Sequence, residues 1–478
     1  MHRRGLPPII SHEFYEALNL GNQCLLCFLQ KNLPYQKILE YSSKESYQLW
    51  LRPCNFYLID SVQINSQLVC YLNFPIKIYF KIIMIRTLKA FDIKGKNILL
   101  RVDFNVPLEN EHVSNNFRIK AALPTIINCV DMGASVTIMS HLGRPNGFVD
   151  KKYSLMPVGE ELAQLIEMPI KFSEDCISSD AIDTSLGLKP GEIHLLENLR
   201  FYKQEIENDE EFSRNLSRHG HIYINDAFGT AHRSHASNVG VTSYFKHRGI
   251  GWLMHKELNF LKNLVNQPNE DLTLIVGGAK VDTKIKLIYN FLHKAKNIII
   301  GGGMAFTFLK AMGKNIGGSL LEESMVPVAL DLINKARMNN VNLILPCDVL
   351  CAKSFESKSV EGCFAIDSIP KDLMGLDIGD NTIELFSSVI SSSSIMVWNG
   401  PMGVFEKPNF SKGTKKIGKV LSDIVSEQVK VVVGGGDTAA ALELFGLDSN
   451  MTHISTGGGA SLELLSGNSL PAIQSLEN

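Results

Sequence analysis

The stretch VVVGGGDTAAALELFG, residues Val431–Gly446, decides the fold class. The three β-branched residues Val431–Val433 predict the end of a buried strand. Gly434–Gly436 predict a turn in which the backbone approaches a ligand closely, because glycine has no Cβ. A strand that ends in such a turn and leads into a helix is typical of an α/β sheet with a binding site at the carboxyl ends of its strands.

The residues after this turn predict a helix N-terminus that binds an anion. Asp437 and Thr438 stand where an N-cap is expected, the helix continues over Thr438–Phe445, and Gly446 ends it. No lysine follows the glycines as in a Walker P-loop, and the spacing is not the dinucleotide pattern G-x-G-x-x-G. Taken alone, the stretch leaves open a tight turn without a ligand.

Length and composition describe an ordinary globular protein. The 478 residues leave room for two or three domains, and 45% of them are hydrophobic. A net charge of −2 gives no electrostatic reason to expect a nucleic acid or an anionic membrane as partner. Nine cysteines spread over this length do not form a disulfide framework, which favours a reducing compartment.

Residues 1–83 differ from the rest of the chain. They have no sustained helical or strand periodicity, and polar residues interrupt their most apolar part, Val69–Ile85, so it is too short for a membrane span. Met84 immediately precedes a well-patterned segment. We expect Met84 to be the natural start, with 1–83 either a mis-assigned start or disordered; an unusual localisation extension is the alternative. Peptides from 1–83 in the native protein would contradict a mis-assigned start.

After Met84, short apolar strands alternate with amphipathic helical segments, which predicts parallel α/β architecture. The strands expected in the first half are Asn97–Val102, Val136–Ser140, Ile193–Leu196 and His221–Ile224. Those expected in the second half are Thr273–Val276, Asn297–Ile300, Asn342–Leu345, Ile395–Trp398, Val429–Val433 and His453–Ser455. Between the halves, Lys256–Val265 predicts a connecting helix with an apolar face, broken at Pro268.

Polar and cationic side chains follow the strands of the first half. Because ligands bind beyond the carboxyl ends of parallel strands, we expect these side chains to gather at one sheet edge. Arginine grips phosphate and carboxylate with two parallel hydrogen bonds, so the set suits a small polyanion. The residues after these strands are Asp103, Asn105, His141, Arg144, Glu197, Asn198, Arg200, Asn225, Asp226, His232, Arg233 and His235, and Arg118 stands at the start of a helical segment.

Glycines follow the strands of the second half. Repeated glycine turns indicate backbone amides that face phosphates, and two lysines follow the first turn. The turns are Gly277–Gly278, Gly301–Gly303, Gly434–Gly436 and Gly457–Gly459, and the lysines are Lys280 and Lys284. A cationic half and a glycine-lined half together indicate phosphoryl transfer between two anionic substrates.

The ordered set of motifs from Met84 to Asn478 resembles the phosphoglycerate kinase family. The motifs are LLRVDFNVPL, SHLGRP, LLENLRF, YINDAFGTAHRSHAS, GGAKV-x-x-KI, IIGGGMAFTFLKA, VWNGPMGVFE, VGGGDTAAA and STGGGASLELL. The resemblance implies two Rossmann-like parallel-sheet lobes, each a three-layer α/β/α sandwich, joined by a helix and a hinge. It also implies the reversible, Mg²⁺-dependent transfer of the acyl phosphate of 1,3-bisphosphoglycerate to ADP.

The same resemblance implies a domain plan. A phosphoglycerate lobe over 84–255 is followed by an interdomain helix and hinge over 256–268. A nucleotide lobe over 269–461 precedes a tail over 462–478 that returns to the first lobe. A cytoplasmic monomer with small-molecule substrates, and with neither nucleic acid nor membrane as partner, is the expected form.

Site residues carry over from the family by position. The glycerate and its non-transferred phosphate would contact Asp103, Phe104, Asn105, Arg118, His141, Leu142, Gly143, Arg144, Arg200 and Arg233. The nucleotide would contact Gly278, Lys280, Lys284, Gly302, Leu376, Asn399, Pro401, Glu406, Gly435, Gly436, Asp437 and Thr438. Asp437 would serve the Mg²⁺ side through the nucleotide or water. The transferring group would be stabilised by Arg118, Lys280 and Gly436.

Two rival functions make different demands on the sequence. A Rossmann-type dehydrogenase needs G-x-G-x-x-G after its first strand, where this chain has DFNVP at 103–107. A non-catalytic scaffold with the same fold predicts losses among the arginines, the lysines or the GGDT loop, and all of these are present.

Overall fold

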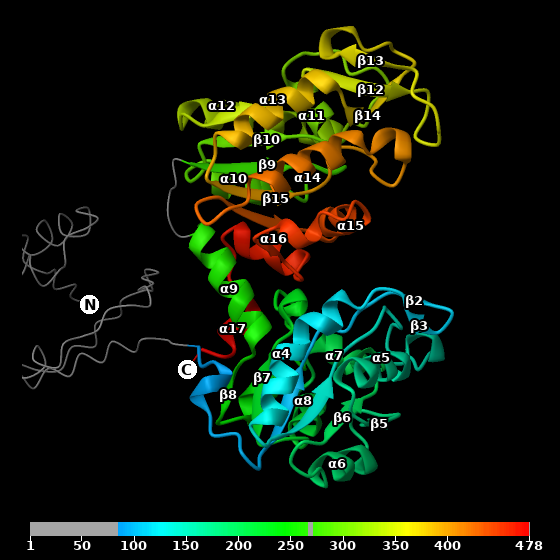
Figure 1. Ribbon diagram of the computed structural model, residues 1–478, viewed down its shortest axis with the longest axis vertical. Coiled ribbons are helices and arrows are strands. Elements are labelled where there is room, and N and C mark those ends of the chain that lie inside the picture. The colour runs from blue at the N-terminus through cyan, green and yellow to red at the C-terminus, as the bar shows by residue number, and fades with distance from the viewer. Residues whose placement is uncertain (1–84, 266–270, 478) are drawn as a thin grey trace, which may run out of the picture. The chain divides into compact units, whose positions relative to one another are not determined.

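The computed structural model describes residues 85–265 and 271–477, and all of them fall within one structural unit, Lys81–Asn478 (Figure 1). The expectations for residues 1–83 and for the helix break at Pro268 lie outside the described residues.

The first lobe is built on a six-stranded sheet in which every pair of neighbours is parallel. The strand order is β5-β6-β4-β1-β7-β8. The strands are β1 (Asn97–Arg101), β4 (Ser135–Met139), β5 (Ile170–Ser173), β6 (Ile193–Leu196), β7 (Ile222–Asn225) and β8 (Arg248–Ile250). The helices are α4 (Phe117–Asp131), α5 (Met156–Ile166), α6 (Ser179–Leu186), α7 (Lys203–Glu207) and α8 (Glu210–Ser217).

The central strand β1 shows why this lobe has three layers. Ile98 and Leu100 belong to one apolar cluster with Ile119 of α4. The residue between them, Leu99, belongs to a second cluster with Phe212 of α8. Successive residues of a strand face opposite sides, so a continuous apolar run requires helices on both faces of the sheet.

The second lobe repeats this plan with another six-stranded parallel sheet, in the order β11-β10-β9-β15-β16-β17. Its strands are β9 (Leu272–Val276), β10 (Asn297–Ile300), β11 (Asn342–Ile344), β15 (Ile395–Asn399), β16 (Lys430–Gly434) and β17 (His453–Ile454). Its helices are α10 (Ile285–Phe291), α11 (Ala305–Ala311), α12 (Val326–Met338), α13 (Asp380–Ser391), α14 (Lys412–Ile424), α15 (Gly436–Leu444) and α16 (Gly459–Leu465).

Each strand expected from the sequence is present, and no end is displaced by more than one residue. The edge strands β5 and β8 were not predicted, because neither is a continuous apolar run. Two antiparallel sheets were also missed. They consist of β12 (Asp348–Ala352), β13 (Gly362–Ala365) and β14 (Met374–Ile378), and of the hairpin β2 (Leu108–Glu109) and β3 (His112–Val113).

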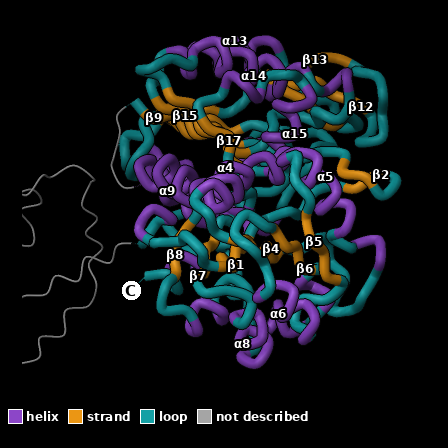
Figure 2. The backbone as a smooth tube through the Cα atoms, turned by 60° about the horizontal axis from the view of Figure 1, so that its bottom comes forward, coloured by secondary structure: helices purple, strands orange, loops and turns teal. Residues whose placement is uncertain are grey.

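The helix α9 (Trp252–Val265) connects the two sheets, as both views of the backbone show (Figures 1 and 2). It begins at Trp252 rather than at the expected Lys256, because Asp226 of the first lobe accepts the Met254 N–H at 2.9 Å and caps the first turn. Leu258 and Leu261 are buried as expected.

The chain returns to the first lobe at its C-terminal end. In α17 (Pro471–Gln474) the Ala472 N–H donates to the Ala231 carbonyl at 3.1 Å. The Ser475 hydroxyl also donates to the Asn238 carbonyl at 3.3 Å. The described C-terminal residues therefore bond directly to the loop after β7.

Candidate active site

The glycine turn after β16 leads directly into α15. The expected N-cap at Asp437 and Thr438 is wrong, because the helix begins at Gly436 and Gly435 is its N-cap residue, with φ +96°. This left-handed backbone is accessible to glycine at no steric cost, so the helix starts earlier than the side chains indicate. The first amides of α15 have no intrahelical acceptor and face outward from the turn.

Three other strand ends of the second lobe pack against one another through glycine. The Gly278 N–H donates to the Pro401 carbonyl at 2.8 Å, and the Gly302 N–H donates to the Met402 carbonyl at 3.1 Å. A Cβ on Gly302 would lie 2.5 Å from the Gly278 nitrogen, so a larger residue cannot enter. Close backbone packing thus brings the ends of β9, β10 and β15 together.

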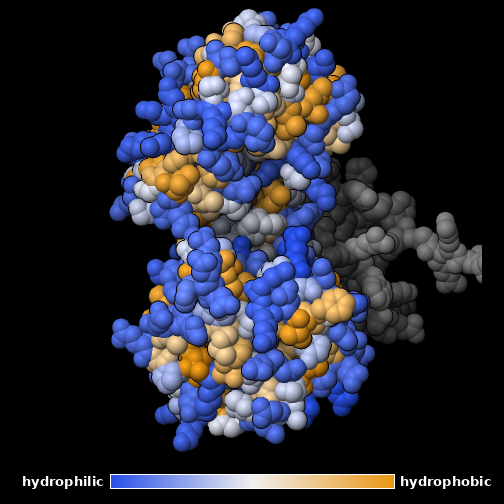
Figure 3. Space-filling view, turned by 90° about the vertical axis from the view of Figure 1, so that its right-hand side faces the viewer, coloured by the Kyte–Doolittle hydropathy of each residue, from blue (hydrophilic) through white to orange (hydrophobic). Residues whose placement is uncertain are grey.

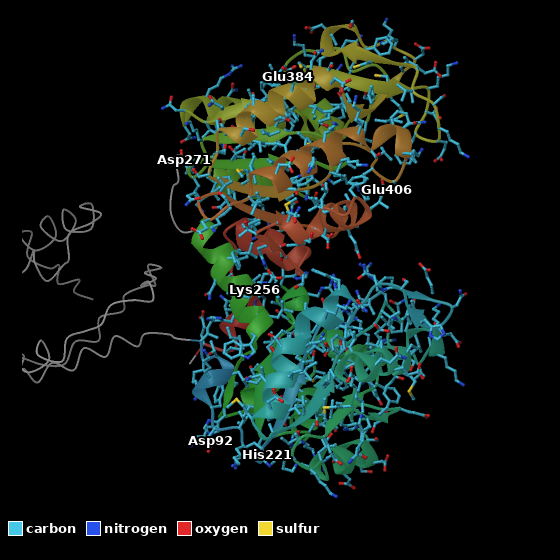
Figure 4. The ribbon with its side chains drawn as sticks, in the orientation of Figure 1. Asp92, His221, Lys256, Asp271, Glu384 and Glu406 are labelled. Carbon is cyan, nitrogen blue, oxygen red and sulfur yellow. The ribbon has the colours of Figure 1, made fainter. Side chains whose placement is uncertain are left out.

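The expected adenosine residues lie farther along this edge. The Leu376 carbonyl accepts the Val404 N–H at 2.9 Å, while its side chain packs into a small apolar cluster with Phe410. Glu406 follows in the same loop, and its side chain is exposed (Figure 4). The structure therefore places Leu376 beside the loop that carries Pro401 and Glu406.

Lys284 and Asn399 form a polar pair beside the glycine turn. The Lys284 ammonium donates to the Asn399 side-chain oxygen. Burial lowers the pKa of Lys284 to about 8, and the nearby Asp437 carboxylate opposes this shift. The Asn399 Nδ2 is buried without a partner in the described part of the chain, and it would lie 3.2 Å from a Cβ on Gly435. Lys280, by contrast, is exposed.

A cavity of about 130 Å³ collects five of the ten expected substrate residues of the first lobe. The Arg118 Nη1 donates to Asp103 Oδ2 and to the Asn105 carbonyl, both at 3.1 Å. The lining residues are Asp103, Asn105, Arg118, His141, Gly229, Thr230, His232, Arg233 and Gly457–Gly459. The glycine turn of the second half therefore meets the cationic residues of the first half here.

Five expected substrate residues do not line this cavity. Phe104 and Leu142 have buried side chains in the apolar core, so only their backbone could reach a ligand. Arg200 is 6% exposed and donates to the Gly143 carbonyl at 2.6 Å, while its Nε is buried without a partner among the described residues. Arg144 is exposed. A Cβ on Gly143 would lie 2.3 Å from the Tyr153 ring, which explains the glycine.

Positive charge is concentrated around this cavity. Burial, followed by the repulsion of Arg233 and Arg101, lowers the pKa of Arg200 to about 10. Burial and four neighbouring arginines hold the pKa of His141 well below its usual range, so its imidazole is neutral. A bound polyanion would relieve this repulsion, so the electrostatics favour an anionic substrate.

Three residues that the sequence interpretation did not single out, Arg101, Glu205 and Ser237, lie behind the residues that line the cavity. Arg101, at the end of β1, is fully buried and lies 3.3 Å from His141 through its Nη2. Glu205 and Ser237 lie behind it, and His232 faces Gly459. A charged residue inside the apolar strand ILLRV was the available signal for Arg101. Glu205 and Ser237 gave none, because they come from different parts of the chain.

Residues 88–468 match the family described as "PGK: Phosphoglycerate kinase". The chain is 46% identical to phosphoglycerate kinase of Thermosynechococcus vestitus over 82% of this chain and 98% of that protein. The chain belongs to the phosphoglycerate kinase family. Its reaction is the reversible transfer of the acyl phosphate of 1,3-bisphosphoglycerate to ADP, which gives 3-phosphoglycerate and ATP.

Solved structures of phosphoglycerate kinases support this assignment. The chain matches the enzyme from Coxiella burnetii with a TM-score of 0.74 and 38% identity, covering 82% of this chain and 99% of that one. The match to the enzyme from Pyrococcus horikoshii has a TM-score of 0.72 and 30% identity, covering 82% and 98%. The two-lobed α/β fold expected from the sequence is therefore confirmed.

The described residues contain neither a helix suited to cross a membrane nor a cluster of metal-binding side chains. Between residues 85 and 477, with 266–270 set aside, no helix combines the length and apolarity needed to cross a bilayer. Over the same residues no cluster of three or more His, Cys, Asp or Glu side chains could hold a metal ion. Figure 3 shows the surface narrowed between the two lobes, with hydrophilic side chains on both sides.

Proposed function

We propose that the two lobes divide the two substrates between them. The first-lobe residues Asp103, Asn105, Arg118, His141 and Arg233 hold the glycerate and its non-transferred phosphate. Arg200 supports them from behind Gly143, and Arg144 meets the substrate from the exposed side. The observation that carries this proposal is the 130 Å³ cavity, which Arg118 and Arg233 line together with Gly457–Gly459. Guanidinium groups bind phosphate and carboxylate with paired hydrogen bonds.

The second lobe holds the nucleotide. The backbone at Gly278, Gly302, Pro401 and Leu376 forms the wall of the adenosine pocket, and Glu406 accepts a hydrogen bond from the ribose. Lys284 and Asn399 lie beside the amides of Gly435 to Thr438, where the nucleotide phosphates bind. Close backbone approach and the start of a helix both favour phosphate at this position.

Magnesium binds together with the nucleotide. Asp437 is an exposed carboxylate in the first turn of α15, and no second carboxylate or imidazole joins it to form a metal cluster in the described part of the chain. A single carboxylate fits Mg²⁺ that keeps phosphate and water ligands, since this ion is usually bound by one or two carboxylates and substrate phosphates. When bound, Mg²⁺ supplies positive charge against the nucleotide phosphates.

Transfer needs positioning and charge rather than a protein nucleophile. The substrate carboxylate or the terminal ADP oxygen attacks phosphorus in line. Arg118 from the first lobe, with Lys280 and the Gly436 amide from the second, stabilises the negative charge on the transferring group. The exposed Lys280 reaches the phosphoryl group when the lobes approach each other.

Closure of the lobes about the 256–268 helix and hinge brings these groups together and excludes water. The lobes span 84–255 and 269–461, and the tail 462–478 returns to the first lobe. X-ray scattering tests closure: both substrates together should reduce the radius of gyration more than either one alone. Identical profiles for the free and doubly liganded protein would contradict closure.

The active form is a monomer in the cytoplasm. Both halves of the site lie within one chain, so chemistry requires no second copy. The described cysteines are all free, which fits a reducing compartment. Sedimentation at micromolar concentration should give the mass of a single chain.

A further inference from the structure

A chain of buried polar groups runs behind the substrate cavity. The Arg101 Nε donates to Ser237 Oγ at 2.8 Å. The Ser237 hydroxyl donates to Glu205 Oε1 at 2.7 Å, and the Ser237 N–H donates to Glu205 Oε2 at 2.9 Å. All three residues are fully buried. Charges removed from water must be paired, so Glu205 balances Arg101 through the serine.

The other side of the Arg101 guanidinium contacts His141. Arg101 Nη2 lies 3.3 Å from His141 Nδ1, and its Nη1 donates to the Val102 carbonyl. A guanidinium has only donors, so Nδ1 of His141 must accept and carries no proton. The neutral imidazole therefore has its proton on Nε2.

The other neutral tautomer of His141, with its proton on Nδ1, has no comparable hydrogen-bond acceptor. Asp103 Oδ1 lies 3.7 Å from His141 Nδ1, which exceeds a hydrogen-bond distance, and Asp103 Oδ2 already accepts from Arg118 at 3.1 Å. A proton on Nδ1 would also face the Arg101 N–H groups. The charged groups around His141 are Asp103, Arg101, Arg118, Arg200 and Arg233, and the four cations oppose an imidazolium.

His235 also lies near Glu205, but it does not replace Arg101 as the cation that balances the Glu205 carboxylate. His235 Nδ1 lies 3.7 Å from Glu205 Oε1, and burial lowers the pKa of His235 to about 3, so it is neutral. The pKa of Glu205 is raised, because the effect of burial exceeds the opposing effects of Arg101 and the two Ser237 hydrogen bonds. Because Ser237 donates to both oxygens, we assign Glu205 as the carboxylate.

We propose that Glu205, Ser237 and Arg101 are positioning residues that fix His141 as the Nε2–H tautomer and present this donor to the anionic substrate. His141 lines the cavity, and its Nε2 has no hydrogen-bond partner in the part of the chain that the structure describes. The proposal rests on the assignment of this cavity to phosphoglycerate. It adds a neutral donor to a site otherwise dominated by arginine.

Nitrogen NMR of the full chain labelled with ¹⁵N-histidine tests the tautomer directly. The His141 signals are identified by their loss in His141→Gln. At pH 7 the wild-type protein should show a proton on Nε2 and none on Nδ1, and Ser237→Ala should show a mixture of tautomers. A proton on Nδ1 of His141, or an imidazolium, in the wild-type protein would overturn the proposal. This outcome does not depend on whether any variant folds.

Steady-state kinetics test the consequence for substrate binding. Ser237→Ala should raise the KM for 3-phosphoglycerate by about fivefold to tenfold, as expected for a weakened hydrogen bond to a charged group, with the KM for ATP unchanged. His141→Gln, whose amide nitrogen lies near the Nε2 position, should bind 3-phosphoglycerate better than His141→Asn. The control is Ser213→Ala, a buried serine of α8 that donates to the Asp209 carbonyl.

The outcomes separate this proposal from the site assignment. If Arg118→Ala and Arg233→Ala leave the KM for 3-phosphoglycerate unchanged, the assignment of the cavity is wrong, and the tautomer measurement still stands. If those variants weaken binding but Ser237→Ala behaves like Ser213→Ala, the positioning role is wrong. A general loss of packing would lower the melting temperature of both Ser237→Ala and Ser213→Ala. The KM for 3-phosphoglycerate would then be the same in the two variants.

Discussion

The Thr438 hydroxyl oxygen accepts the Gly400 N–H at 2.7 Å and so ties the first turn of α15 to the loop after β15. Thr438 is fully buried. Thr438→Val keeps the shape but leaves the Gly400 N–H unsatisfied, which should cost about 1–3 kcal/mol of stability. Because both segments border the proposed site of the nucleotide phosphates, the KM for ADP should also rise several-fold. Urea unfolding and steady-state kinetics measure the two effects.

Thr452, which directly precedes β17, provides a matched control. The Thr452 hydroxyl oxygen accepts the Val431 N–H at 3.0 Å, at the opposite end of β16 from the glycine turn. Thr452→Val should lower stability to a similar degree and leave the KM for ADP unchanged. Equal KM changes in both variants would show that Thr438 acts only through general stability.

We expect Lys284, as a proposed nucleotide-binding residue, to make nucleotide binding pH-dependent in the alkaline range. Its pKa in the free protein is lowered from 10.5 to about 8 by burial. Only the ammonium form attracts phosphate, so nucleotide affinity should fall as pH rises through about 8. Lys284→Arg should flatten this dependence between pH 7 and 9, because arginine stays protonated. Calorimetric titration with ADP provides the measurement, and an equally steep loss in Lys284→Arg would contradict the role of Lys284.

Two buried histidines make the first lobe sensitive to acid. Ser185 Oγ lies 2.9 Å from His194 Nδ1 and 2.7 Å from His219 Nδ1. Burial lowers the pKa of both histidines from 6.5 to about 4. The unfolded chain binds more protons between these values, so stability is fully present above pH 6.5 and is lost as pH falls toward 4.

The difference between a pKa of about 4 in the folded protein and 6.5 in the unfolded chain corresponds to a loss of at most roughly 3 kcal/mol in the free energy of unfolding for each histidine. His219→Gln removes the ring that contacts Ser185 and the Cys176 carbonyl, so the variant should be less stable than the wild type at pH 7. It also removes one titrating group, so it should lose less stability between pH 7 and 5. Urea midpoints at the two pH values test this. The control His112→Gln changes an exposed histidine of the β2–β3 hairpin and should keep the wild-type acid sensitivity.

Asp437 should affect the metal dependence rather than the fold. Asp437→Asn removes one exposed carboxylate from the first turn of α15, so the melting temperature should change little. The Mg²⁺ concentration needed for half-maximal activity should rise about tenfold, as expected for the loss of a carboxylate beside the ion. Asp448→Asn, in the turn after α15, is the control. An unchanged Mg²⁺ requirement would exclude Asp437 from the metal side.

The sequence predicted the parts of the fold that depend on local pattern. Apart from β5 and β8, the strands of both parallel sheets were found because each contains an apolar run. The edge strands β5 and β8 were missed, since an edge strand is covered less evenly and Lys171 interrupts the run in β5. The early start of α9 was missed because its cap, Asp226, comes from another strand.

The sequence named residues of the candidate site but not the positions of all their side chains. His141 and Arg233 could be named because polar residues after buried strands converge at one edge of a sheet, and Arg118 was named with them although it stands at the start of a helix. The same rule could not show that Arg200 lies behind Gly143 or that Arg144 stays outside the cavity, since side-chain direction depends on packing. The network of Arg101, Ser237 and Glu205 joins residues distant in the sequence and is visible only in three dimensions.

The most direct test is the rate of ATP formation from 1,3-bisphosphoglycerate and ADP by the wild-type chain and by Arg118→Ala. The wild type should form ATP, and Arg118→Ala should lose at least about a hundredfold in kcat with an unchanged melting temperature, because Arg118 meets charge that develops during transfer. Arg337→Ala, an exposed arginine of α12 outside the cavity, should retain wild-type activity. A loss in Arg118→Ala of less than about tenfold would contradict the account.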